Sequence, residues 1–64
     1  MSSRTKIEIA IEIAQNVIAD GRVIGDGKGW VESLRIEVEF ECNEHGYDED
    51  DCEEIAEAAV NLYA

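Results

Sequence analysis

Two cysteines and a histidine in the second half of the chain carry the kinds of side chain that bind zinc in proteins. Cys42, His45 and Cys52 follow the spacing C-x2-H-x6-C, and thiolate and imidazole groups bind zinc in a tetrahedral arrangement. A structural zinc site usually has two closely spaced ligand pairs, whereas this segment supplies one incomplete set. These residues therefore stand as metal candidates beside a simpler interpretation, in which both cysteines are small core residues and His45 lies in a turn. Whether the cysteines are free, bridged by a disulfide or bound to metal stays open at this stage.

Acidic residues form the second group with chemical potential, and they gather at one end of the chain. The chain has 64 residues, with 16 acids against 5 lysines and arginines, and a formal net charge of −11. Residues 1–35 carry equal numbers of acids and bases, so the whole net charge lies in residues 36–64, which have neither lysine nor arginine. Repulsion from phosphate groups argues against direct binding to nucleic acid or to an anionic membrane. The charge favours cationic protein surfaces as partners.

The acids of residues 48–51 do not form a motif for calcium binding or catalysis. Their run, Asp-Glu-Asp-Asp, lacks the alternating ligands, the central glycine and the final glutamate of an EF-hand loop. Paired carboxylates can transfer protons, but a chain of this length has little room for a cleft. We therefore predict one domain over residues 1–64 that is not an enzyme and has no cofactor.

The elements that must position these residues begin with a predicted helix over residues 4–20. Its polar residues fall within one arc of a helical wheel, and its isoleucine, valine and alanine residues fill the opposite side. Ser3 is a suitable cap for the start of this helix, and Gly21 is suitable just past its end. The alternating isoleucines of this segment leave a second interpretation open, in which residues 5–14 form a strand.

The middle of the chain predicts two strands. Apolar and charged residues alternate from Leu34 to Cys42, which is the pattern of a strand with one buried face. Trp30 has the same parity, so the strand is expected to begin there. A short strand over residues 22–24 is expected to pair with its first part through a glycine-rich hairpin loop over residues 25–29. The rest of the long strand would then keep an unpaired edge.

A second helix is predicted over residues 48–63. Gly46 permits a turn before it, Asp48 is a good N-cap, and the acids that follow suit the first turn of a helix. The order helix, short strand, long strand, helix predicts a small α+β domain in which both helices pack on one face of an antiparallel sheet. The alternative fold is a three-stranded sheet that includes residues 5–14 and has one C-terminal helix.

The predicted long strand gives the acids a regular geometry. Alternate residues of a strand lie roughly 6.5–7 Å apart on one face, so Glu37, Glu39 and Glu41 would form a row of carboxylates. Nucleic acid also presents a row of anions, one per about 3.4 Å of axis in each strand. A rigid acidic row could therefore occupy a groove lined by lysine and arginine, whereas the competing interpretation is a solvated face that promotes solubility. The predicted partner-binding residues are Glu37, Glu39, Glu41, Glu44, Asp48, Glu49, Asp50 and Asp51.

This layout resembles that of small inhibitor proteins encoded by bacteriophages, namely anti-CRISPR proteins and DNA-mimic anti-restriction proteins. The resemblance consists of a very short acidic chain with Glu-Val-Glu-Phe-Glu on a predicted strand and Asp-Glu-Asp-Asp opening a predicted helix. It extends over the whole chain in size, charge and layout. It implies an inhibitor that blocks a nucleic-acid-binding effector, such as a CRISPR–Cas complex, by occupying its DNA or guide-RNA groove. It assigns no catalytic residue.

Two other functions remain open from the sequence. A small structural or assembly module would self-associate, as a homodimer, through the free strand edge or an apolar helix face. A metal-binding switch would use Cys42, His45 and Cys52. The chain has no run of 18 apolar residues and no secretory signal at its start, which predicts a cytoplasmic protein, in a bacterial host if the phage resemblance holds.

Overall fold

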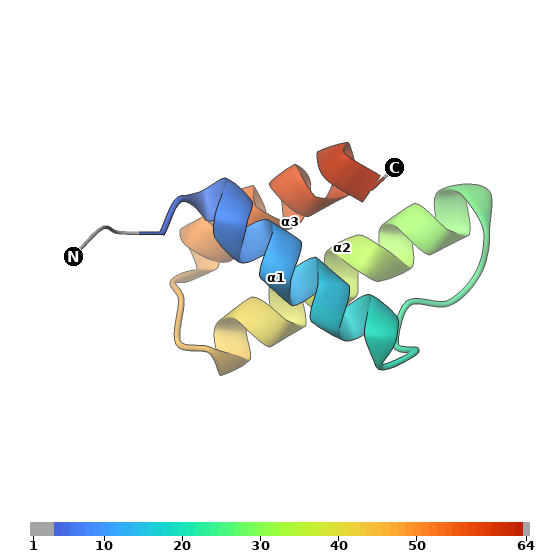
Figure 1. Ribbon diagram of the computed structural model, residues 1–64, viewed down its shortest axis with the longest axis horizontal. Helices are drawn as coiled ribbons and strands as arrows, with labels where there is room; N and C mark the ends of the chain where they lie inside the picture. The colour runs from blue at the N-terminus through green and yellow to red at the C-terminus, as the bar shows by residue number, and fades with distance from the viewer. Residues whose placement is uncertain (1–3, 64) are drawn as a thin grey trace.

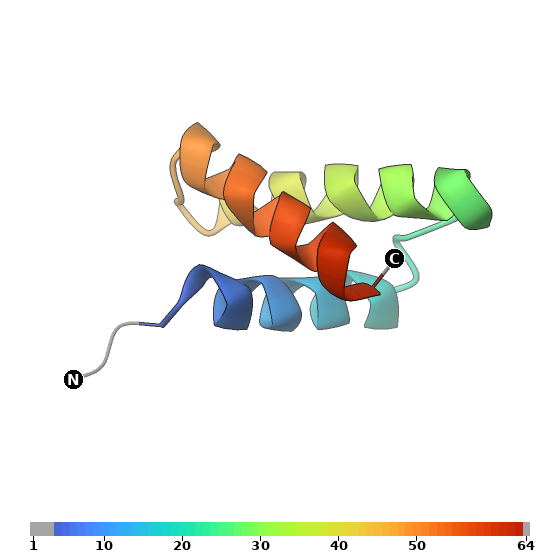
Figure 2. The same cartoon turned by 90° about the horizontal axis from the view of Figure 1, so that it is seen from above.

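The computed structural model describes residues 4–63 and shows three helices packed together (Figure 1). Helix α1 spans Lys6–Ala19, α2 spans Gly27–Glu44 and α3 spans Glu49–Tyr63. Each helix contacts the other two. The chain reverses direction at each connection, and α3 runs diagonally beside α1 and α2 (Figure 2). No strand occurs within residues 4–63. The α+β prediction and its three-stranded alternative are therefore both wrong, and this part of the chain is an all-α domain.

Helix α1 confirms the helix predicted for the first segment, and it has well-defined ends. The Thr5 hydroxyl accepts a hydrogen bond from the Glu8 amide at 3.2 Å, and the Glu8 carboxylate accepts one from the Thr5 amide at 3.1 Å. This capping box satisfies amides that the first turn leaves free. The predicted cap, Ser3, lies outside the described residues. At the other end Gly21 has φ +73°, and its amide donates to the Ile18 carbonyl at 3.0 Å, which stops the helix.

Helix α2 replaces the predicted long strand. Leu34, Val38 and Cys42 are each 0% exposed, and residues spaced by four lie along one side of a helix. Trp30 extends the same side and packs partly buried against the core. The even-numbered apolar residues of this segment therefore fit the alternation of a strand, but every second one of them also lies on one side of a helix.

The other apolar residues of that alternation show why the strand prediction fails. Ile36 and Phe40 are 58% and 57% exposed, although on a strand they would share one face with the buried stripe. A strand over residues 30–42 would need a partner of similar length to pair its backbone amides, and residues 22–24 are too few to provide it. A helix pairs its own backbone and still buries the stripe of every fourth residue. We attribute the helix to these two gains, which come at the cost of leaving Ile36 and Phe40 in water.

The glycine-rich segment 25–29 leads into α2 and is not the predicted hairpin loop. Asp26 takes the N-cap position with extended backbone (φ −144°), and the helix begins at the next residue. Gly25 has φ +95°, and a Cβ atom there would lie 3.3 Å from the carbonyl carbon of Gly29. This position therefore requires glycine. Residues 22–24, the predicted short strand, form an irregular connection between α1 and α2.

Helix α3 confirms the predicted C-terminal helix. The Asp48 carbonyl accepts a hydrogen bond from the Cys52 amide at 2.8 Å, which places Asp48 at the start of the helix as predicted. Small and aliphatic residues of α3 pack against α1 and α2, and every buried side chain recorded for the core is apolar. Trp30 and Tyr63 pack partly buried at the margin of this core. Within residues 4–63, no helix combines the length and apolar character needed to cross a membrane.

Candidate acidic binding surface

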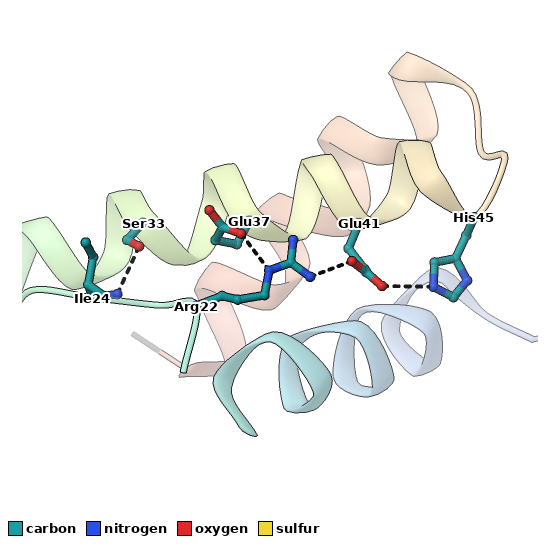
Figure 3. Close-up of polar contacts among 6 residues, drawn as sticks. All are labelled: Arg22, Ile24, Ser33, Glu37, Glu41 and His45. Carbon is teal, nitrogen blue, oxygen red and sulfur yellow. Dashed lines mark hydrogen bonds and ion pairs between the residues drawn. The ribbon is translucent and has the colours of Figure 1, made fainter. Parts of the chain in front are cut away.

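Helix α2 separates the three glutamates that the sequence predicts as one row. Successive residues of an α-helix turn by about 100°, so Glu37 and Glu41 lie on one side of α2 and Glu39 lies on another. Glu37 and Glu41 both bind Arg22, which lies in the connection between α1 and α2 (Figure 3). The predicted row of three equally spaced carboxylates is therefore wrong.

Arg22 forms a two-armed ion pair with Glu37 and Glu41. Its Nε donates to Glu37 Oε1 at 2.9 Å, and its Nη1 donates to Glu41 Oε1 at 2.6 Å. The hydrogen bond to Glu41, and then the one to Glu37, raise the pKa of the Arg22 guanidinium. The same contact with Arg22 lowers the pKa of the Glu41 carboxyl group, because it favours the charged form. An arginine from the first half of the chain thus binds two of the predicted partner-binding acids and balances one of their two negative charges.

Lys6 binds two further acids across the contact between α1 and α3, and its single charge balances one of them. Its Nζ lies 3.3 Å from Asp51 Oδ1 and also pairs with Glu54. Hydrogen bonds to Glu54 and then to Asp51 raise the pKa of the Lys6 amine. All three side chains are more than two-fifths exposed, so water and salt screen these pairs. Asp51, another predicted partner-binding residue, therefore shares one lysine with Glu54.

The acids that remain unbalanced begin at the turn between α2 and α3. Glu44, Asp48, Glu49 and Asp50 are exposed, and no ion pair is recorded for them within the described part of the chain. All four belong to the predicted partner-binding set, and the turn brings them to one end of the bundle. Glu39, the other member without a recorded ion pair, is partly exposed on α2.

Helix α3 carries a row of carboxylates that the predicted set omits. Glu53 and Glu57 follow Glu49 at four-residue intervals and are exposed, so the three lie along one side of the helix. With a rise of 1.5 Å per residue, successive positions lie about 6 Å apart along the axis. We refer to Glu49, Glu53 and Glu57 as the α3 acidic row. Their four-residue spacing within a predicted helix is the sequence signal that identifies the row.

Two of the three zinc candidates, Cys42 and Cys52, are neighbours in the core, and His45 lies apart from them. Cys42 and Cys52 are free thiols buried in the core, and no group of metal ligands forms among residues 4–63. His45 is exposed at the C-cap of α2, where its Nε2 lies 3.4 Å from Glu41 Oε2 and its ring stacks on that of Tyr47. Burial, followed by the neighbouring Cys52 thiol, raises the pKa of Cys42 to about 12. Both cysteines therefore act as small core residues, which is the simpler of the two predicted interpretations.

Comparisons of this chain with protein-family models, with curated proteins and with solved structures find no match. Its class therefore follows from the fold and the surface alone. The described residues form a small acidic three-helix domain whose unbalanced carboxylates lie at the α2–α3 turn and along α3.

Proposed function

We propose that this protein is a non-catalytic inhibitor that binds a cationic surface of another protein through the α2–α3 turn and the α3 acidic row. The partner is a nucleic-acid-binding effector, such as a CRISPR–Cas complex in the cytoplasm of a bacterial host. The acids would occupy the groove in which this effector holds DNA or guide RNA. The observation that carries the proposal is the pairing of charges: Arg22 and Lys6 bind other carboxylates and leave this surface unmatched.

The shape of the acidic surface supports the proposal. The α3 acidic row belongs to a helix that packs against the core through Ile55, Ala56 and Ala59, so the carboxylates project from a rigid support. Their spacing of about 6 Å corresponds to roughly two phosphates along one strand of nucleic acid. Asp50 adds a further exposed acid beside the row. Lysine and arginine side chains that normally bind phosphates can reach carboxylates arranged in this way.

The distribution of charge also favours an interaction over solubility alone. Surfaces that only promote solubility usually mix both signs of charge, whereas residues 44–57 contain eight acids and neither lysine nor arginine. Repulsion between like charges destabilises a small domain. A cationic partner would relieve this repulsion on binding, and the attraction would speed association at low salt.

The test is displacement of labelled DNA from a panel of purified effectors that includes a CRISPR–Cas complex and a restriction enzyme. Fluorescence anisotropy of the DNA is followed while the protein is added at low and at high salt. We expect the protein to displace DNA from at least one effector, and this displacement to weaken as salt rises. If no effector releases DNA at low salt, mimicry of nucleic acid is refuted.

Two variants with the same change in net charge locate the surface. E53K/E57K reverses the charge of two of the three residues in the α3 acidic row, and Q15K/N16K/D20K makes an equal change in net charge at exposed positions of α1 and its C-cap. We expect E53K/E57K to lose displacement by at least tenfold and the α1 variant to stay within a few-fold of the native protein. Equal losses in both variants would show that total charge, and not the α3 acidic row, determines binding.

A further inference from the structure

Helix α2 has a second apolar side whose large side chains the rest of the described chain leaves more than half exposed. Ile36 and Phe40 lie four residues apart on one side of the helix, away from the buried stripe. They are 58% and 57% exposed, and Ile24 in the preceding connection is 69% exposed. Single exposed apolar side chains are common on proteins, but three large ones gathered at one helix form a patch of the kind used for binding.

The connection between α1 and α2 holds this patch in place. The Ile24 amide donates to Ser33 Oγ at 3.1 Å, which fixes the connection against α2 (Figure 3). A groove of about 440 Å³ lies between this connection and α2, lined by Ile24, Ser33, Ile36 and neighbouring residues. At the other end of the patch, the Arg22 guanidinium lies 5.8 Å from the centroid of the Phe40 ring. Arg22 is itself held by its ion pairs, so the surface is largely formed before any partner binds.

The charged neighbours of the patch indicate the partner. On a helix, residues three and four apart are neighbours. The ionisable residues of α2 at these distances from Ile36 and Phe40 are all acids: Glu32, Glu37, Glu39 and Glu44. Arg22 also lies against Phe40, but it is shared between Glu37 and Glu41. Glu32, Glu39 and Glu44 therefore supply the negative charge that a partner meets. Lys28 and Arg35, the bases on this helix, lie farther round its circumference. A partner must therefore present apolar side chains flanked by positive charges.

We propose that the exposed patch of Ile24, Ile36 and Phe40, with the groove beside Ile24 and Ile36, docks an amphipathic helix that carries lysine or arginine beside its apolar side. Such a helix would place two or three aliphatic side chains on the patch and its basic side chains against the flanking glutamates. A second copy of this chain fits poorly, because it would bring the same glutamates against one another. This inference goes beyond the proposed function: it concerns the outer side of α2, and it requires neither the α3 acidic row nor a nucleic-acid groove.

The probes are three synthetic 18-residue peptides. The first contains leucine and lysine in an order that gives one apolar helical side, the second has the same composition in a shuffled order, and the third has glutamate in place of lysine. Binding is measured by fluorescence anisotropy of the labelled peptide at physiological salt, and the contact site is located by amide chemical shifts. We expect the first peptide to bind at least tenfold more tightly than either of the others, with shifts centred on Ile24, Ser33, Ile36 and Phe40.

Two variants remove equal numbers of exposed apolar side chains from different places. I36Q/F40Q changes the patch, whereas I7Q/L62Q changes exposed residues of α1 and α3 that are 56% and 50% exposed. Glutamine is a good helix former, and circular dichroism checks that both variants fold. We expect I36Q/F40Q to weaken binding of the first peptide at least tenfold, and I7Q/L62Q to change it less than threefold.

Several outcomes would overturn the inference. Equal binding of the ordered and shuffled peptides, or unchanged binding by I36Q/F40Q, would show that charge alone attracts the peptide. Sedimentation equilibrium that shows a native dimer lost in I36Q/F40Q would assign the patch to a second copy. E53K/E57K separates the two proposals, because it removes displacement of DNA but keeps the preference for the ordered peptide.

Discussion

The assignment of residues 30–42 to a helix predicts that neighbouring apolar residues differ sharply in their contribution to stability. Leu34 is 0% exposed and Ile36 is 58% exposed, although both belong to one alternating pattern. On a strand these residues would share a face, and truncating either to alanine would cost a similar free energy. On α2, Leu34 lies in the core and Ile36 lies in water. The pair L34A and I36A therefore tests the fold directly.

The expected magnitudes follow from burial. Truncating a buried leucine to alanine costs about 2–5 kcal/mol, from lost transfer free energy and from the cavity left behind. A substitution at an exposed position such as Ile36 usually changes stability by less than about 0.5 kcal/mol. In a domain of this size, 1 kcal/mol shifts Tm by roughly 4–8 °C. L34A should therefore lower Tm by about 10 °C or more, and I36A by no more than about 4 °C.

Thermal unfolding gives Tm and urea unfolding gives the free energy of unfolding, both followed by circular dichroism at 222 nm for the native protein and both variants. A domain of this length has a total stability of only about 3–10 kcal/mol, so L34A can leave the chain unfolded even without urea. V38A removes less buried volume and serves as a milder second variant, with an expected loss of roughly 2 kcal/mol. If L34A or V38A lowers the free energy of unfolding by the same amount as I36A, the helix assignment is refuted and the strand is favoured.

Four further predictions follow from particular contacts. T5A removes the hydroxyl half of the α1 capping box and should cost about 1 kcal/mol in urea unfolding. Because Arg22 lowers the pKa of Glu41, the stability from this pair is complete above the unfolded carboxyl pKa of about 4.3 and is lost as pH falls through the lower folded value. The difference in unfolding free energy between the native protein and E41Q should therefore shrink as pH falls from about 5 to about 3. Since burial raises the pKa of Cys42 to about 12, its thiol should not react with Ellman's reagent at pH 8 unless urea unfolds the chain. Raising salt from about 10 mM to about 150 mM should increase Tm by screening repulsion among the acids, and a Tm that falls or stays constant would contradict this.

The sequence predicts the two outer helices correctly, although the alternating isoleucines of residues 5–14 also fit a strand. In α1 an apolar side, a polar side and a terminal glycine all indicate the same element, and in α3 the turn at Gly46 and the start at Asp48 do so as well. The middle segment carries a conflict. Its even-numbered apolar residues fit a two-residue period, and those at positions 30, 34, 38 and 42 also fit a helical stripe. Tertiary packing decides between them, and single-sequence patterning does not contain that information.

The acidic surface was predictable in composition but not in geometry. The excess of acids in residues 36–64 identifies the charged region from the sequence alone. Which acids stay unbalanced depends on which bases the fold brings to them, and both Arg22 and Lys6 reach carboxylates far along the chain. Those pairings follow from the packing of three helices, so they could not be inferred from spacing. The α3 acidic row, in contrast, follows from the four-residue spacing of its glutamates once the segment is assigned to a helix.

The helix in place of the strand changes what the acids can do and at the same time creates the α2 patch. A strand would have aligned its glutamates on one face and buried Ile36 and Phe40 on the other. The helix turns Glu37 and Glu41 toward Arg22, which removes them from the free surface and holds the connection before α2. The same rotation exposes Ile36 and Phe40 among glutamates.

An acidic domain of this kind can attract a basic partner over a distance by charge and then hold it by apolar contacts at short range. Association depends on the summed electric field of the protein, whereas residence time depends on contacts from which water is excluded. Raising salt should therefore slow association with such a partner, whereas I36Q/F40Q should speed its dissociation.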